Sequence, residues 1–164
     1  LMNSDVRAYE KTFQLLHQVA GRAGRDTKPG FVYVQTYTPD HPLFDILQRH
    51  DRDGFMALEQ QQRKEANLPP FTRMAALIIS SRKENDLIEF CKKFARNRPS
   101  HSKVTVLGPA PAPLYQRQSK YRYRFLLECP KTVNIQNYIQ TWLQKSSIPY
   151  TVHITVDIDP YTFF

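Results

Sequence analysis

Apolar and polar positions in the first part of the chain alternate between helical and extended patterns. After a potential acidic cap at Asp5, apolar side chains recur at helical spacing and predict a first helix: Tyr9, Phe13, Leu16 and Ala20. The β-branched and aromatic run FVYVQTY, residues 31–37, predicts a strand. A short helix capped by Asp40 follows, and a longer helix begins near Asp51 and ends before the prolines of NLPP.

The second part of the chain follows the order strand, helix, strand, strand, helix, strand. The patterns place the strands in residues 72–81, 103–108, 121–128 and 150–159, and the helices in residues 84–97 and 134–145. The apolar positions predicted to face inward are Leu87, Phe90, Cys91 and Phe94 in the first helix, Ile135, Tyr138, Ile139 and Trp142 in the second, and Val152, Ile154, Val156 and Ile158 in the last strand. The proline-punctuated residues 109–120 predict a stiff loop, because proline cannot donate to a sheet. Two such halves commonly build an antiparallel sheet with both helices on one face.

The fold class that follows is α+β. Residues 68–164 are expected to form a small α+β sandwich, ferredoxin-like or ribosomal-protein-like in its order of elements. Residues 1–67 contain one predicted strand and three predicted helices, which cannot complete a sheet by themselves. We therefore expect the chain to be a piece of a longer protein, with the first part completed by segments outside it.

The net charge of +8 is unevenly distributed along the 164 residues. Residues 1–67 hold nine basic and nine acidic residues, whereas residues 68–164 hold fourteen basic and six acidic ones. This difference marks a boundary near the NLPPF segment and separates domains 1–67 and 68–164. A basic excess indicates a polyanionic partner such as nucleic acid, or alternatively a well-solvated surface.

Cysteines, histidines and apolar runs restrict the class of protein further. Cys91 and Cys129 are the only two cysteines, which predicts neither a disulfide framework nor a zinc site, and favours a cytoplasmic location. The five histidines lack metal-ligand spacing, so no metal site is expected. No apolar run approaches the roughly 20 residues of a membrane span. Asp157 and Asp159 end the last strand and predict a capped strand end, with a carboxylate pair as the alternative.

The stretch HQVAGRAGR, residues 17–25, combines two glycines with two arginines at the end of a helical pattern. If the helix continues, Gln18, Arg22 and Arg25 share one face. Gly21 and Gly24 remove side chains beside the arginines, so a ligand can approach the backbone. Two guanidiniums and an amide suit a phosphate tail, as in an arginine finger. The alternative is a basic helix end stabilised by the helix dipole.

The densest basic segment, YQRQSKYRYR, interleaves cations with tyrosines. The predicted DNA-binding residues are those that can neutralise phosphates or stack on bases: Arg117, Lys120, Tyr121, Arg122 and Arg124. Strand alternation places the tyrosines on one face and the arginines on the other, which makes Tyr123 a core residue beside Phe125. We expect weak, salt-dependent binding to branched or single-stranded DNA.

Several of these stretches together resemble one protein family. QVAGRAGR is similar to motif six of superfamily-two helicases, and DVRAYEKTFQLL, VLGPAPAPL, YRYRFLLE and VDIDP resemble the primosomal protein N′ (PriA) family. The resemblance implies that residues 1–67 end a RecA-like helicase lobe. It also implies an ATP-dependent 3′-to-5′ DNA helicase that acts in replication restart and primosome assembly at stalled forks.

The resemblance assigns roles to individual residues. Arg25 and Arg22 are the implied catalytic fingers, and Gln18, Gly21 and Gly24 would face ATP and Mg²⁺. The implied partners are forked and single-stranded DNA, other primosome proteins and the acidic tail of the single-stranded-DNA-binding protein, with no membrane. That tail would meet Gln136 and Lys131, although Thr132 stands where the family has arginine.

Parts of the family pattern are missing from this chain. It has no glycine-rich loop followed by lysine, no paired acidic motif for Mg²⁺ and no cysteine cluster for the family's zinc. We therefore expect the chain alone to lack ATPase activity. Two alternatives remain at this point: a nucleic-acid-binding module of ribosomal-protein type with no link to ATP, and an RNA helicase fragment.

Overall fold

The computed structural model describes residues 7–23 and 30–161. The chain forms two compact units, Leu1–Ala66 and Asn67–Phe164. No helix among the described residues is long and apolar enough to cross a membrane.

The first unit is built around three helices, α1 (Ala8–Ala20), α2 (Pro42–Gln48) and α3 (Arg52–Glu65). Their apolar faces meet in a small core of Phe13, Leu43 and Phe55. The rings of Phe13 and Phe55 stack with centroids 3.9 Å apart. The small size of this core follows from the polar composition of α3, which buries only a narrow stripe.

The helix caps of this unit depart from the sequence pattern at one point. The predicted cap Asp5 lies outside the described residues. The cap of α2 is His41 and not Asp40, because the His41 ring accepts a hydrogen bond from the Leu43 N–H at 3.2 Å. Asp51 caps α3 as predicted and accepts from the Gly54 N–H at 2.8 Å.

The prediction of a strand in residues 31–37 is wrong for this chain. These residues have no strand assignment, and Phe31, Tyr33 and Tyr37 are exposed. A strand exists only when its main-chain groups pair with a neighbour, and the described part of this unit contains no other strand. The high β propensity of the segment is therefore not realised.

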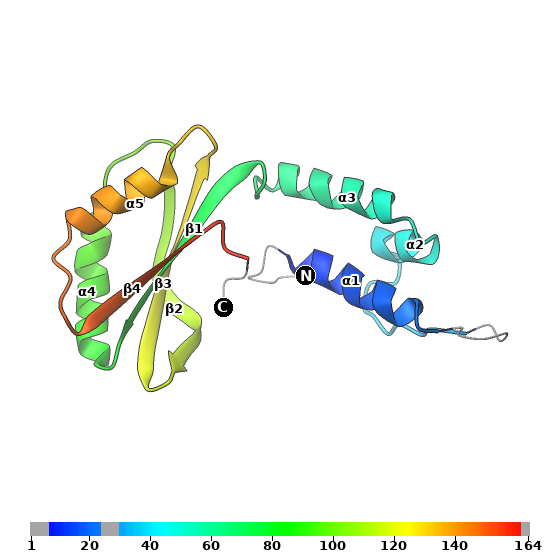
Figure 1. Cartoon of the computed structure of the whole chain (residues 1–164), viewed down its shortest axis with the longest axis horizontal. Helices are drawn as coiled ribbons and strands as arrows, with labels where there is room; N and C mark the ends of the chain where they lie inside the picture. The colour runs from blue at the N-terminus through cyan, green and yellow to red at the C-terminus, as the bar shows by residue number, and fades with distance from the viewer. Residues whose placement is uncertain (1–6, 24–29, 162–164) are drawn as a thin grey trace. The chain divides into compact units, whose positions relative to one another are not determined.

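The second unit is a two-layer α+β fold, which confirms the predicted class and order of elements. It runs through β1 (Thr72–Ser81), α4 (Glu84–Arg96), β2 (Thr105–Arg117), β3 (Lys120–Pro130), α5 (Ile135–Gln144) and β4 (Val152–Ile158). The strands form one antiparallel sheet in the order β2-β3-β1-β4. Both helices cover the same face of this sheet (Figure 1).

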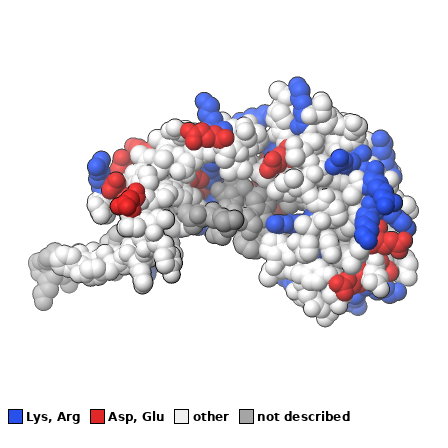
Figure 2. Space-filling view, turned by 180° about the vertical axis from the view of Figure 1, so that it is seen from behind, with Lys and Arg blue, Asp and Glu red and all other residues white. Residues whose placement is uncertain are grey.

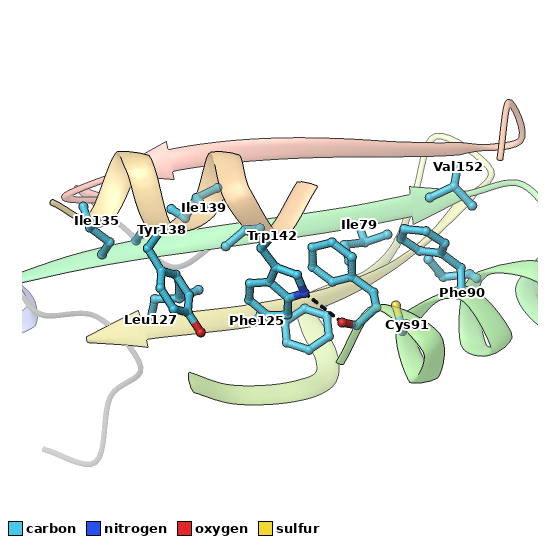
Figure 3. Packing of buried hydrophobic residues seen from close by; sticks show 14 of the residues in the cluster. Ile79, Phe90, Cys91, Phe125, Leu127, Ile135, Tyr138, Ile139, Trp142 and Val152 are labelled. Atoms are coloured by element: carbon cyan, nitrogen blue, oxygen red, sulfur yellow. Dashed lines mark hydrogen bonds between the residues drawn. The ribbon is translucent and has the colours of Figure 1, made fainter. Parts of the chain in front are cut away.

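The core of the second unit lies between the sheet and the two helices (Figure 3). Trp142 of α5 stacks on Phe94 of α4 with ring centroids 4.3 Å apart. Its indole N–H donates to the Phe94 carbonyl oxygen at 2.8 Å, so the buried polar atom has a partner. The faces predicted from helical spacing are buried here, Leu87, Phe90, Cys91 and Phe94 in α4 and Ile135, Tyr138, Ile139 and Trp142 in α5.

The proline-rich segment corrects a second prediction, because it belongs to β2 and not to a loop. Ala110 and Pro111 pair with Arg124 and Tyr123 of β3, and the register shifts on both sides of them. Proline is tolerated here because β2 is an edge strand with one partner only. The register shifts absorb the positions at which ladder hydrogen bonds are missing.

The end of β4 is closed by an acidic residue. The Asp159 carboxylate accepts a hydrogen bond from the Met74 N–H at 3.2 Å and pairs with the Arg73 guanidinium at 2.8 Å. This is the predicted capped strand end. The alternation predicted for β4 holds, since Val156 lies opposite the buried Leu77 on the same face as Ile154, although Val156 itself is exposed on this edge strand.

Candidate functional site

The hairpin that joins β2 to β3 carries the predicted DNA-binding residues. Arg117 and Lys120 pair across a two-residue turn. Gln118 and Ser119 form this turn with φ angles of 51° and 57°. Positive φ at both central residues matches the twist of the flanking strands, the geometry of a type I′ turn. All four of these residues, at the tip of the hairpin, are exposed.

The cations of β3 form a row on the sheet face that the helices leave open. Lys120, Arg122 and Arg124 alternate with tyrosines that point to the helix side. Residues two apart on a strand lie about 7 Å apart, so the three side chains follow one line. Beside the row, Ser80 and Ile78 of β1 pair with Arg122 and Arg124. This open row is suited to a chain of phosphates.

The tyrosines pack into a cluster on the other side of the strand. Tyr115 lies 5.7 Å from Tyr121 and 5.8 Å from Tyr123, measured between ring centroids. Tyr121 and Tyr123 are half-buried against the main core. The core role that the sequence predicted for Tyr123 is therefore confirmed, and Tyr121 lies on the same side of the strand.

Two contacts of this hairpin were not foreseen from the sequence. The Tyr115 hydroxyl donates to the Glu84 carboxylate at the start of α4, and this hydrogen bond raises the pKa of Tyr115. The Arg122 guanidinium donates to the Leu114 carbonyl at 3.4 Å. Leu114 and Tyr115 both lie in the segment after Pro111 in which the register of β2 against β3 shifts. No local sequence pattern predicts this shift.

Charge on the second unit is strongly biased toward cations. In Figure 2, Lys and Arg side chains gather along the outer edge of this unit on the side of α4, away from the β2–β3 turn, with a smaller acidic group beside them. Arg117, Lys120 and Arg122 form no ion pair with a described residue. Their charges are therefore available to an external anion.

The end of α1 differs from the continuous helix on which the shared face was predicted. The helix ends at Ala20, and Gly21 and Arg22 lie in the turn that follows. Gln18 and Arg22 are exposed. Gly24 and Arg25 lie outside the described residues. The helix on which the shared face of Gln18 and Arg22 was predicted therefore ends two residues before Arg22, although Gly21 keeps a helical backbone conformation.

Gly21 is not required by the backbone of this turn. Its φ is −70° and it caps α1 with an N–H bond to the His17 carbonyl. A Cβ added there would meet that oxygen at 3.4 Å, an ordinary contact. Among the residues that the structure describes, nothing around Gly21 requires a glycine, which fits the predicted close approach of a ligand.

The predicted partner-tail residues lie at the start of α5. Lys131, Thr132 and Gln136 are all exposed. Asn134 caps the helix and accepts from the Asn137 N–H at 2.9 Å. Lys131 precedes this cap and Gln136 follows it, so both side chains are reachable by a peptide.

Metal and thiol chemistry find no support among the described residues. No group of three His, Cys, Asp or Glu side chains in that part of the chain is placed to hold a metal ion. Cys91 and Cys129 are free and buried. Burial raises the pKa of the Cys91 thiol to about 12, which makes it a poor nucleophile at neutral pH.

These features define a two-layer α+β domain with a cationic row on an edge hairpin, preceded by a small helical unit. Residues 64–161 match the family model described as primosomal protein N C-terminal domain, and the chain belongs to this family.

Relatives match over almost the whole chain. A replication restart protein PriA from Rickettsia felis is 43% identical over 162 residues, which is 99% of this chain and 25% of the relative. The proteins of the same name from Haemophilus influenzae and Bacillus subtilis are 38% and 33% identical over 98% and 96% of the chain. The chain therefore spans about a quarter or less of the length of these relatives.

Proposed function

We propose that the chain forms the C-terminal part of an ATP-dependent 3′-to-5′ DNA helicase that acts in replication restart and primosome assembly at stalled forks. The family match and the name of the relatives support the replication-restart role. Within such a protein, residues 1–67 would end the second RecA-like lobe, and the domain that follows would bind DNA. The observation that carries the proposal is the row Lys120, Arg122 and Arg124 on the open face of a domain of this family.

The helix-end arginines would serve the ATP site. Arg25 and Arg22 would meet the charge that builds on the transferring phosphoryl group, and Gln18 would link the phosphate tail to lobe closure. The exposed backbone at Gly21 supports this role, because nothing among the described residues requires a glycine there. ATP, Mg²⁺ and zinc would be held chiefly by other parts of the full-length protein.

A single substitution in the full-length protein tests the catalytic assignment. We expect Arg25→Ala to lower ATP turnover by about 10³-fold, since a finger contributes on the order of 10³ to 10⁵ in rate. ATP affinity, followed with a fluorescent analogue, should change little. Arg49→Ala, an exposed arginine at the end of α2, is the control and should keep normal turnover. Normal turnover after loss of both Arg22 and Arg25 contradicts the assignment.

The DNA-binding assignment is tested on the 164-residue chain. We expect it to bind a labelled fork in fluorescence anisotropy with a strong dependence on salt. In Lys120→Gln/Arg122→Gln, the slope of log affinity against log salt should fall by about 2, one for each lost phosphate contact. Lys92→Gln/Lys145→Gln removes the same charge elsewhere and is the matched control. An equal loss of fork affinity in both double variants would show that the row contributes only general electrostatic attraction.

The same domain would bind the acidic tail of the single-stranded-DNA-binding protein through Lys131 and Gln136. Lysine supplies charge but no bidentate fork, so this contact would be weaker than one made by arginine at position 132. We expect Thr132→Arg to tighten binding of an acidic tail peptide by about tenfold in calorimetry, the effect of one charge-assisted contact. If Thr132→Arg gave no gain in affinity, the tail would bind at another site.

A further inference from the structure

A second cationic surface lies at the end of the sheet opposite the β2–β3 turn. The loop between α4 and β2 faces the start of α5 across a hollow of about 600 Å³. A second hollow of about 440 Å³ opens on the other side of the same loop. Pro99, Ser100, His101 and Tyr138 line both hollows. We call these two spaces together the loop hollows.

The loop hollows are lined by groups that suit an anion. Most residues that line the larger hollow carry a hydroxyl, amide or imidazole group: Ser100, His101, Ser102, Thr132, Asn134, Asn137, Tyr138 and Thr141. Lys103 adds a cation on this side, and Arg96 and Arg98 add two on the other. Among the described residues that line either hollow, none is Asp or Glu.

The three cations lack ion-pair partners in the part of the chain that the structure describes. Arg96, Arg98 and Lys103 are exposed and form no ion pair with any described residue. This distinguishes them from Lys93 in the same helix, which pairs with Glu89 at 2.9 Å. Like charges gathered without counter-charges repel one another unless an anion lies between them.

The loop is held in place by contacts on both sides. The Tyr138 hydroxyl of α5 donates to the Pro99 carbonyl at 2.8 Å, and the Tyr138 ring meets the His101 ring edge-on at 6.2 Å. The Lys103 N–H donates to the His101 ring at 3.1 Å, and the Val104 N–H donates to the His101 carbonyl at 3.2 Å. A loop fixed in this way pays little ordering entropy when a ligand binds.

The separation between the loop hollows and the basic row of β3 favours DNA as the ligand. The row occupies the first half of β3 and the hollows lie beyond its far end, so the two surfaces together extend along a strand of 11 residues, about 35 Å. Duplex DNA covers this length with roughly ten base pairs. A nucleic-acid backbone is long enough to reach both surfaces.

From this arrangement, and resting on the proposed function, we propose that the loop hollows are a second contact for the phosphodiester backbone of DNA. Arg96, Arg98 and Lys103 neutralise phosphates, and the side chains of Ser100, Ser102 and Asn137 donate or accept hydrogen bonds around them. Thr132, at the margin of the larger hollow, belongs to the acidic-tail site proposed above. Groups of this kind fix the position of the backbone without reading bases. With the row of β3, the domain holds DNA at both ends of its sheet.

Anisotropy with a labelled fork tests the second contact on the 164-residue chain. Arg98→Gln/Lys103→Gln should weaken fork binding by about fivefold at low salt and lower the salt slope by about 2. The matched control Lys92→Gln/Lys145→Gln should change both quantities much less.

Each pattern of results decides between the two proposals. If Lys120→Gln/Arg122→Gln weakens binding and Arg98→Gln/Lys103→Gln matches the control, the proposed function stands and the second contact is overturned. If only the loop variant weakens binding, the second contact stands and the assignment of the row is overturned. If both variants match the control, both fail.

Chemical protection gives a readout that does not depend on a variant. Lys103 should be protected from acetylation when the chain is saturated with fork DNA, as measured by mass spectrometry, whereas Lys145 should not. Protection of Lys103 by an acidic peptide, with no protection by DNA, would overturn the proposal in favour of a protein partner.

Discussion

Gly21 and Gly108 occupy opposite backbone environments. Gly21 has a helical φ of −70° and room for a Cβ. Gly108 has a φ of 110°, and a Cβ there would lie 2.7 Å from the Arg124 carbonyl oxygen. Only the second position therefore requires glycine for the fold.

Alanine substitutions at the two sites should separate these roles. We expect Gly108→Ala to lower the free energy of unfolding by at least about 2 kcal/mol, because strain and a backbone clash add. Unfolding in urea can be followed by the fluorescence of Trp142, the single tryptophan.

Gly21→Ala serves as the counterpart. It should leave stability unchanged or raise it by up to about 1 kcal/mol, measured by circular dichroism. If it also lowers ATP turnover of the full-length protein, close approach of a ligand explains the glycine. A marked loss of stability would instead give Gly21 a role in folding.

At the scale of single residues, the sequence predicted which helix positions are buried but not which surface residues contact one another. Leu87, Phe90 and Cys91 were assigned to the core from helical spacing, since burial on one face follows from a local period. The contact between Tyr115 and Glu84 joins residues 31 apart in sequence. No spacing rule relates such distant positions.

At the scale of elements, the hairpin turn departs from its preferred chemistry. Type I′ turns favour Asn-Gly, whereas Gln118 and Ser119 hold positive φ here. A non-glycine residue in this region costs about 1–2 kcal/mol. The turn therefore stores unfavourable energy at the tip of the basic hairpin.

Replacing the turn should recover part of that energy. We expect Gln118→Asn/Ser119→Gly to raise the free energy of unfolding by about 1–2 kcal/mol in a urea titration. Ser147→Gly, in an exposed loop, is the control and should give no gain. An equal or lower stability of the turn variant would show that the tip has interactions that compensate for its geometry.

Two elements show why propensity succeeds or fails. Residues 72–81 were predicted as a strand and form β1, which pairs on both sides. Residues 31–37 are richer in β-branched and aromatic residues and yet form no strand, because no partner strand lies in the described part of their unit. The proline-rich segment entered β2 for the converse reason, since an edge position tolerates missing donors.

At the scale of the whole molecule, we expect buried thiols and phenols to make stability fall at alkaline pH. Burial raises the pKa of Cys91 from 9.0 to about 12 and raises the pKa values of Cys129 and Tyr138. A pKa that is higher in the folded state gives stability that is complete below the unfolded pKa and is lost as pH rises through the folded value.

The free energy of unfolding should therefore fall between pH 9 and pH 12. Cys91 alone contributes a slope of up to about 1.4 kcal/mol per pH unit. Cys91→Ala should give a shallower fall over this range, measured by urea unfolding at each pH. An identical pH profile would show that the thiol does not titrate differently in the two states.

The amino-acid sequence alone determined the class of the second unit, the order of its six elements and the residues that fill its core. These properties depend on local periodicity, which each segment carries by itself. The sequence also showed that the excess of basic residues begins near residue 68, because net charge depends on composition alone. Family resemblance added the assignments of Arg22 and Arg25, which local physics alone left open.

Tertiary structure decided the rest. Strand order, the entry of prolines into β2, the early end of α1 and the pairing of Tyr115 with Glu84 depend on which segments meet. The loop hollows also exist only where α4, β2 and α5 converge. Such contacts join positions far apart along the chain, and their energy is set by geometry that no local pattern encodes.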